Sequence, residues 1–85
     1  MTVSGTRQLG AAIRSRRTQV RLTSAQVAAM AHVSRRLLIE VEAGKRPNVG
    51  LSAVIRILGV LGLDLDVNPR GLPGTREGNR ERRDV

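Results

Sequence analysis

The stretch Thr23–Gly44, TSAQVAAMAHVSRRLLIEVEAG, decides how the chain folds. Thr23 is a good N-cap residue, and the Ala-rich run after it favours a helix. Ser34 is a second candidate N-cap, and Gly44 is a natural C-terminal stop for the helix that Ser34 begins. His32 lies between the two, and histidine tolerates a left-handed turn conformation better than most residues. The stretch therefore predicts two short helices joined by a tight turn, over 24–31 and 35–43.

Further helices are predicted on both sides of this stretch. Apolar residues recur at helical spacing between Thr6 or Arg7 and Gln19, and Thr6 is a candidate cap. After a basic loop, Asn48 is a candidate cap for a helix over 49–61. The residues of this last helix that follow one face are predicted to be buried: Leu51, Val54, Ile55, Leu58 and Leu61.

The hydrophobic period changes to two in residues 61–67, LGLDLDV, which predicts a β-strand. A lone strand leaves backbone donors and acceptors unpaired, and no second strand pattern is visible. We therefore expect this strand to pair antiparallel with its copy in a homodimer. Its apolar residues would face the helices, or the small sheet would lie between the subunits. The alternative is an extension of the preceding helix. The predicted dimer-interface residues are Leu61, Leu63, Leu65 and Val67.

The predicted fold class is mainly α, with four helices followed by one C-terminal strand. We expect a flexible leader over 1–5, a single domain over 6–69 and a disordered tail over 70–85, which is rich in Gly, Pro, Arg and Glu. The tail holds five arginines and three acidic residues, so six of the eight net positive charges belong to residues 1–69.

The composition points to a polyanionic partner. The net charge is +8, and 14 of the 15 basic residues are arginine, which suits planar contacts to phosphate and guanine. The absence of aromatic residues argues against base stacking on single strands. With no cysteine and one histidine, the sequence offers no metal site and no nucleophile–base–acid set, so we expect neither an enzyme nor a cofactor. No signal peptide or membrane-length apolar run is visible, which predicts a cytoplasmic, nucleoid-associated protein.

A series of positions spans roughly residues 7–62 in a fixed order: Leu9-Gly10, Ile13-Arg14, Arg17, Leu22-Thr23, Val27-Ala28, Val33-Ser34, Leu38, Val41-Glu42 and Gly44-Lys45. In this order and spacing they resemble the XRE (Cro/C1-type) helix-turn-helix family. The resemblance implies a protein that binds double-stranded DNA at a palindromic operator and places its recognition helix in the major groove.

The helix over 35–43 is the expected recognition helix, with Leu38 and Val41 turned inward. Arginine can donate two hydrogen bonds to guanine, and glutamate can accept one from cytosine, so we expect at least one G·C pair in each half-site. The alternative is that the two arginines contact only phosphate or solvent. Four residues match the base-reading positions of the family: Ser34, Arg35, Arg36 and Glu40.

Other side chains match positions that support such a site. The resemblance implies a structural ion pair between Arg17 and Glu42, tying the first helix to the third. Free backbone N–H groups at the start of helix 24–31 favour a phosphate, although Ser24 is shorter than the glutamine common in the family. Ile39 stays open between a thymine-methyl contact, a protein contact and the edge of the core. The predicted phosphate-binding residues are Thr23, Ser24, Arg17, Lys45, Arg46 and Asn48, and the last three could instead form a solvated basic loop.

The run from Asn48 to Val67, a helix followed without a gap by an alternating segment, resembles HipB-type antitoxins. That resemblance implies a repressor of its own operon with a HipA-type Ser/Thr kinase toxin as partner. Three other interpretations remain open: a stand-alone XRE regulator without a toxin, an interaction module that uses the fold as a scaffold, and a nonspecific nucleoid or RNA binder driven by charge.

Overall fold

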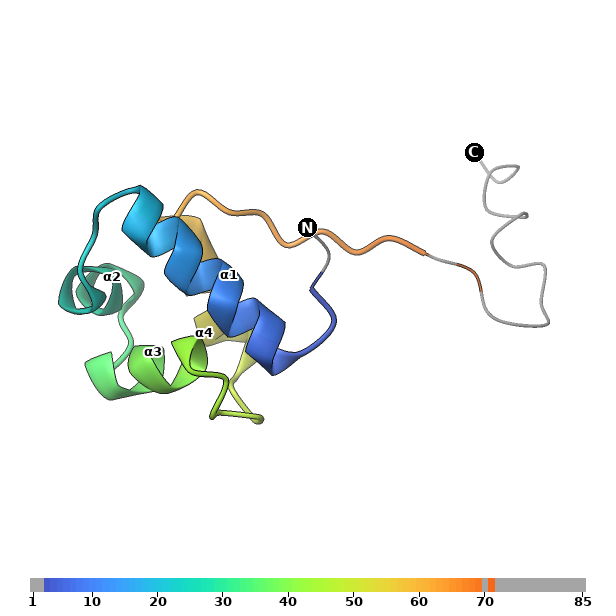
Figure 1. Ribbon diagram of the computed structural model, residues 1–85, viewed down its shortest axis with the longest axis horizontal. Helices are drawn as coiled ribbons and strands as arrows, with labels where there is room; N and C mark the ends of the chain where they lie inside the picture. Colours follow the sequence, from blue (N-terminus) through green and yellow to red (C-terminus); the bar gives the residue numbers. More distant parts are fainter. Residues whose placement is uncertain (1–2, 70, 72–85) are drawn as a thin grey trace.

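The structure is a computed structural model that describes residues 3–69 and 71. Figure 1 shows α1 crossing in front of α4, with α2 and α3 on one side of the pair. The prediction of a mainly helical chain is confirmed for these residues, while the tail predicted over 70–85 falls outside them except for Gly71. The four helices are α1 (Thr6–Gln19), α2 (Ser24–Ala31), α3 (Arg35–Glu42) and α4 (Leu51–Val60).

The caps of α2 and α3 form as the sequence predicts. The Thr23 hydroxyl accepts from the Gln26 backbone N–H at 3.1 Å, and the Gln26 side chain accepts from the Thr23 N–H at 2.8 Å. This reciprocal capping box satisfies two N–H groups that the first turn leaves free. His32 ends α2 in the left-handed region, with φ 58° and ψ 43°. The Ser34 hydroxyl then accepts from the Leu37 N–H at 3.0 Å, which starts α3 immediately.

Two predicted caps are wrong. Thr6 is the first helical residue of α1, and its N-cap is Gly5, which has no side chain to offer. Asn48 forms a turn with Pro47, and α4 begins two residues later than predicted, with Gly50 as its N-cap. Proline is favoured in such turns because its φ is already set, and the turn delays the helix.

Two glycines allow α1 to lie directly against the C-terminal end of α3. A Cβ on Gly10 would stand 2.8 Å from the Glu42 carbonyl oxygen and closer still to that of Val41. Gly44, with φ 70°, ends α3 and brings the chain against the backbone of Arg7. The close approach fixes how α3 is held relative to α1.

The core is entirely aliphatic, and α4 contributes a slightly different face from the predicted one. Val54 and Leu58 are buried as expected, but Leu51 and Ile55 are 63% and 50% exposed. Ile57, which was not predicted, is fully buried. A helix face that contacts one neighbour is narrow, and packing against α2 selects the stripe through Ile57. The largest fully buried side chains are those of Ile13, Val27, Leu38, Ile57 and Leu61.

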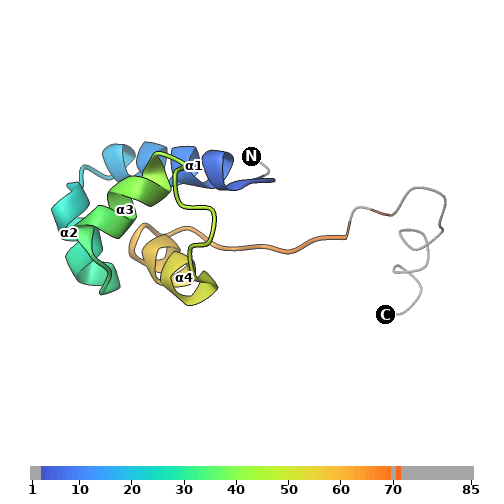
Figure 2. The same ribbon diagram turned by 90° about the horizontal axis from the view of Figure 1, so that it is seen from below.

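The alternating segment forms no strand within the described residues. Leu61 is the C-cap of α4 and only 2% exposed, so it belongs to the core of the monomer. Gly62 has φ 68°, and the Leu63 N–H donates to the Leu58 carbonyl at 2.8 Å, which terminates the helix. The extension of α4 considered as an alternative is therefore excluded. Beyond Leu63 the chain is extended, makes no backbone–backbone hydrogen bond over 64–69, and runs away from the helices (Figure 2).

Candidate nucleic-acid interface

The second helix of the helix-turn-helix, α3, presents one face to the core and the other to solvent. Leu38 and Val41 are buried against α1 and α2, and Leu37 packs at the edge of this core. Arg36 and Ile39 lie on the opposite side and are exposed. The outer face of α3 is therefore uncovered by the described part of the chain.

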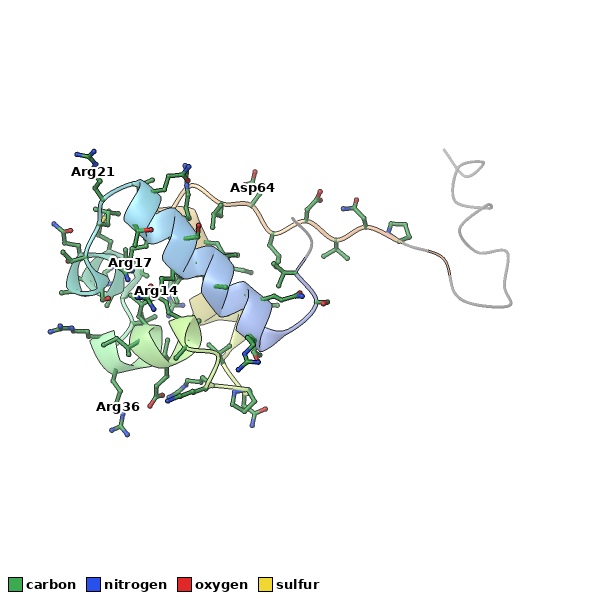
Figure 3. The ribbon with its side chains drawn as sticks, in the orientation of Figure 1. Arg14, Arg17, Arg21, Arg36 and Asp64 are labelled. Carbon is green, nitrogen blue, oxygen red and sulfur yellow. The ribbon has the colours of Figure 1, made fainter. Side chains whose placement is uncertain are left out.

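The predicted base-reading residues take different places on this face. Arg36 has a side chain that is 88% exposed, and Figure 3 shows it pointing away from α3. Arg35 is also exposed at the start of the helix. The hydroxyl of Ser34 accepts the capping hydrogen bond, so it keeps its own O–H as a donor for a ligand.

Glu40 differs from the other three because each of its carboxylate oxygens already accepts a hydrogen bond from an arginine. Oε2 accepts from Arg36 Nε at 3.2 Å, and Oε1 accepts from Arg46 Nη1 at 2.7 Å. The hydrogen bond from Arg46, and then that from Arg36, lowers the pKa of Glu40 below its ordinary value. At neutral pH this side chain is a carboxylate shared by two arginines.

Arg17 and Glu42 form the ion pair expected between α1 and α3. Arg17 Nε and Nη2 donate to the two Glu42 oxygens at 2.7 and 3.0 Å, and Nη1 donates to the Leu22 carbonyl. The two side chains are only 14% and 8% exposed. The hydrogen bonds with Glu42 raise the pKa of Arg17. These contacts favour a structural role for Arg17 over a phosphate contact.

Apart from Arg17, the predicted phosphate-binding residues fall into two groups, one before α3 in the chain and one after it. Thr23 caps α2 and Ser24 begins it, and the backbone N–H groups of Ser24 and Ala25 have no hydrogen-bond partner within the described residues. Lys45, Arg46 and Asn48 are exposed in the loop after α3. The Lys45 N–H donates to the Glu40 carbonyl at 2.9 Å, which holds the start of this loop against the helix.

The sequence reasoning missed several arginines. Arg16 Nε donates to the Leu61 carbonyl and Arg56 Nε to the Ala31 carbonyl, each at 2.9 Å, so these two cations satisfy the carbonyl ends of α4 and α2. Arg21 has φ 63° and is exposed in the turn before α2 (Figure 3). Position near the end of α1 was the only signal for Arg16 and Arg21, and Arg56, in the middle of α4, gave none. The spacing of four between Arg36 and Glu40 did offer a signal for a pair on one helix face.

The described ranges, 3–69 and 71, also bear on metal binding and membrane insertion. They hold no group of three His, Cys, Asp or Glu residues arranged to bind a metal ion. They also contain no helix with the length and apolar character needed to cross a bilayer.

A tight turn joins α2 to α3, and α3 carries exposed arginines. This arrangement defines a DNA-binding protein of the helix-turn-helix class. The family model described as a helix-turn-helix domain matches residues 8–69, and the chain belongs to this family. The match is compatible with the XRE type. A comparison with curated proteins found no match for the chain.

Proposed function

We propose that this protein is a transcription regulator that binds a specific palindromic DNA sequence as a homodimer. The observation that carries the proposal is the outer face of α3, where Arg35 and Arg36 are exposed at the end that would enter a major groove. Cations in the first turn are disfavoured by the helix dipole, so helix stability does not account for two arginines there. Guanine O6 and N7 match the fork of an arginine side chain.

The surroundings of α3 support contacts to the DNA backbone on both sides. The start of α2 offers free N–H groups to one phosphate, and Lys45 in the following loop offers a cation to another. Such contacts orient the protein without reading sequence. The Arg17–Glu42 pair contributes indirectly, because it joins α1 to α3 and so holds the recognition helix in place.

The homodimer is supported by the surface that the monomer leaves exposed. Leu65 and Val67 alternate along an extended segment whose backbone groups lack partners within the described chain. Leu51 and Ile55 expose a second apolar strip on α4. Antiparallel pairing of the segment about a two-fold axis would satisfy its backbone groups and bury Leu65 or Val67. Because Leu61 is already in the core, the interface we propose from the earlier set is Leu63, Leu65 and Val67.

The first test is a footprint combined with a salt titration on selected duplexes. A dimer should protect two half-sites about one helical turn, or a multiple of it, apart. If it neutralises about six to ten phosphates, affinity should fall by roughly 10³- to 10⁵-fold between about 50 and 200 mM salt. Protection of a single asymmetric half-site would contradict the dimer, and no binding at low salt would contradict the function.

A set of alanine variants separates reading from positioning. Arg35→Ala and Arg36→Ala should each reduce discrimination at one base pair by about 1–3 kcal/mol, whereas Lys45→Ala should weaken all sequences alike. Competition titrations with single-base-pair variants of the selected site measure the difference. Equal losses on specific and random DNA for all three variants would refute base reading by α3.

The dimer has its own test at the exposed segment. Leu65→Asp places a charge where two copies would meet, and sedimentation should then report a monomer. Asp64→Leu at the neighbouring position is the matched control, because it alters the opposite face of the same segment. A Leu65→Asp protein that still sediments as a dimer would show that the segment is not the interface.

The resemblance to HipB-type antitoxins extends the proposal to a partner, a HipA-type Ser/Thr kinase toxin, with repression of a shared operon. The alternative is a stand-alone XRE-family regulator. Affinity capture of the tagged full chain from its native host, with mass spectrometry of what is retained, distinguishes them. A retained Ser/Thr kinase supports the antitoxin, and capture of operator DNA without a kinase supports the stand-alone regulator.

A further inference from the structure

We propose that Glu40 is a positioning residue that sets Arg36 for guanine, and that it does not itself read a base. The inference rests on the proposed function and assigns Glu40 a different role from the one suggested by its position in the family. It starts from the cluster in which Glu40 lies between Arg36 on the same helix and Arg46 in the following loop.

The atoms used in this cluster leave the right ones free. Glu40 takes Arg36 by Nε alone, so the two terminal nitrogens of that guanidinium keep their four N–H donors. Those terminal donors form the fork that fits guanine O6 and N7. A side chain that is 88% exposed is otherwise free to rotate, and holding one end of it reduces the ordering needed when DNA binds.

The same contacts argue against Glu40 as a reader of cytosine. Each carboxylate oxygen already accepts from an arginine, and the bond from Arg46 is a short 2.7 Å. Each oxygen keeps a second lone pair, but the negative charge of the carboxylate is already shared by two cations, which makes it a weaker acceptor for cytosine N4. An unpaired carboxylate is repelled by the phosphates, while a carboxylate flanked by two cations leaves the local surface positive.

Arg46 has a second part in this cluster. Its bond to Glu40 spans six residues and, together with the Lys45 N–H bond to the Glu40 carbonyl, fastens the loop to the last turns of α3. The loop cations that we propose for phosphate contacts are therefore held in register with the recognition helix. Glu40 thus positions both the side chain that we propose to read a base and the loop that we propose to contact the DNA phosphates.

The test compares how single-base-pair changes in the selected operator affect wild type, Glu40→Gln, Arg36→Ala and the double variant. Asp64→Asn is the matched charge control, because it also removes one negative charge but lies on the exposed segment away from α3 (Figure 3). Glu40→Gln should reduce discrimination about 3- to 10-fold at the base pair that Arg36 reads. The double variant should be no worse there than Arg36→Ala, and binding to random duplex should not weaken.

Two results would overturn the proposal. One is a loss of discrimination in Glu40→Gln at a base pair that Arg36→Ala leaves unchanged, which is the behaviour of a direct reader. The other is found without DNA: if the NMR signal of the Arg36 Nε–H does not move in Glu40→Gln relative to Asp64→Asn, the pair is not formed in solution. Failure of the wild type to prefer any duplex would instead contradict the proposed function, and the NMR comparison still decides whether the cluster exists.

Discussion

Gly10→Ala offers the sharpest check of how α1 is seated on α3. An alanine in the middle of a helix normally stabilises by about 1 kcal/mol relative to glycine. At Gly10 the added Cβ would meet the carbonyl oxygens of Val41 and Glu42, both backbone atoms that no rotamer change can move. The two helices must separate instead, and with them the packing that holds the recognition helix.

The expected loss of stability in Gly10→Ala is the difference between these two opposing effects. Overpacking against a fixed neighbour costs about 3 kcal/mol, and the gain in helix propensity offsets about 1 kcal/mol of it. The net loss of about 2 kcal/mol should lower Tm by roughly 8–16 °C in a domain of this size. It is a large share of the stability of so small a fold.

The assay is thermal unfolding followed by circular dichroism at two protein concentrations, since a dimer makes Tm depend on concentration. Gly59→Ala is the matched control, because Gly59 lies in α4 with nothing within 4 Å of an added Cβ. It should raise the free energy of unfolding by about 0.5 kcal/mol. A Gly10→Ala protein as stable as the wild type would refute the close approach of α1 and α3.

The other predictions concern charge and backbone conformation. Glu42→Ala should destabilise the fold by about 3 kcal/mol in a denaturant titration, because it leaves Arg17 nearly buried without its partner; a loss below about 1 kcal/mol would mean that the pair is a surface contact. His32→Gly should raise Tm by several degrees by relieving about 1 kcal/mol of left-handed strain, whereas no change would show that the histidine is unstrained there. Folding lowers the pKa of Glu40, so its contribution to stability is present above the ordinary value of 4.5 and is lost as the pH falls through the lowered pKa. Melting curves from about pH 6 to 3 should therefore decline less steeply for Glu40→Gln than for the wild type, and parallel declines would contradict the pairing with Arg46 and Arg36.

Local signals accounted for most of the predictions that the structure confirms. The α2 and α3 boundaries follow from Thr23 and Ser34, whose hydroxyls cap the next few N–H groups with no help from the rest of the chain. The same holds for His32 and Gly44, where the residue type determines whether the backbone can adopt a positive φ without large strain. α1 begins at Thr6 as predicted, but its N-cap is Gly5 and not Thr6, and at Asn48 the turn with Pro47 delays the start of α4 to Leu51.

The sequence by itself determined the helices, the turn between α2 and α3, and the positive charge on the outer side of α3, because caps, hydrophobic period and residue type act within a few residues. Only the tertiary structure decided that Ile57 and not Ile55 is buried, that Leu61 belongs to the core, and that Glu40 is shared between Arg36 and Arg46. Those outcomes depend on which helix packs against which and on a loop that returns to α3. The hydrophobic period of the chain shows which residues share a helix face, but not which other helix or loop that face contacts.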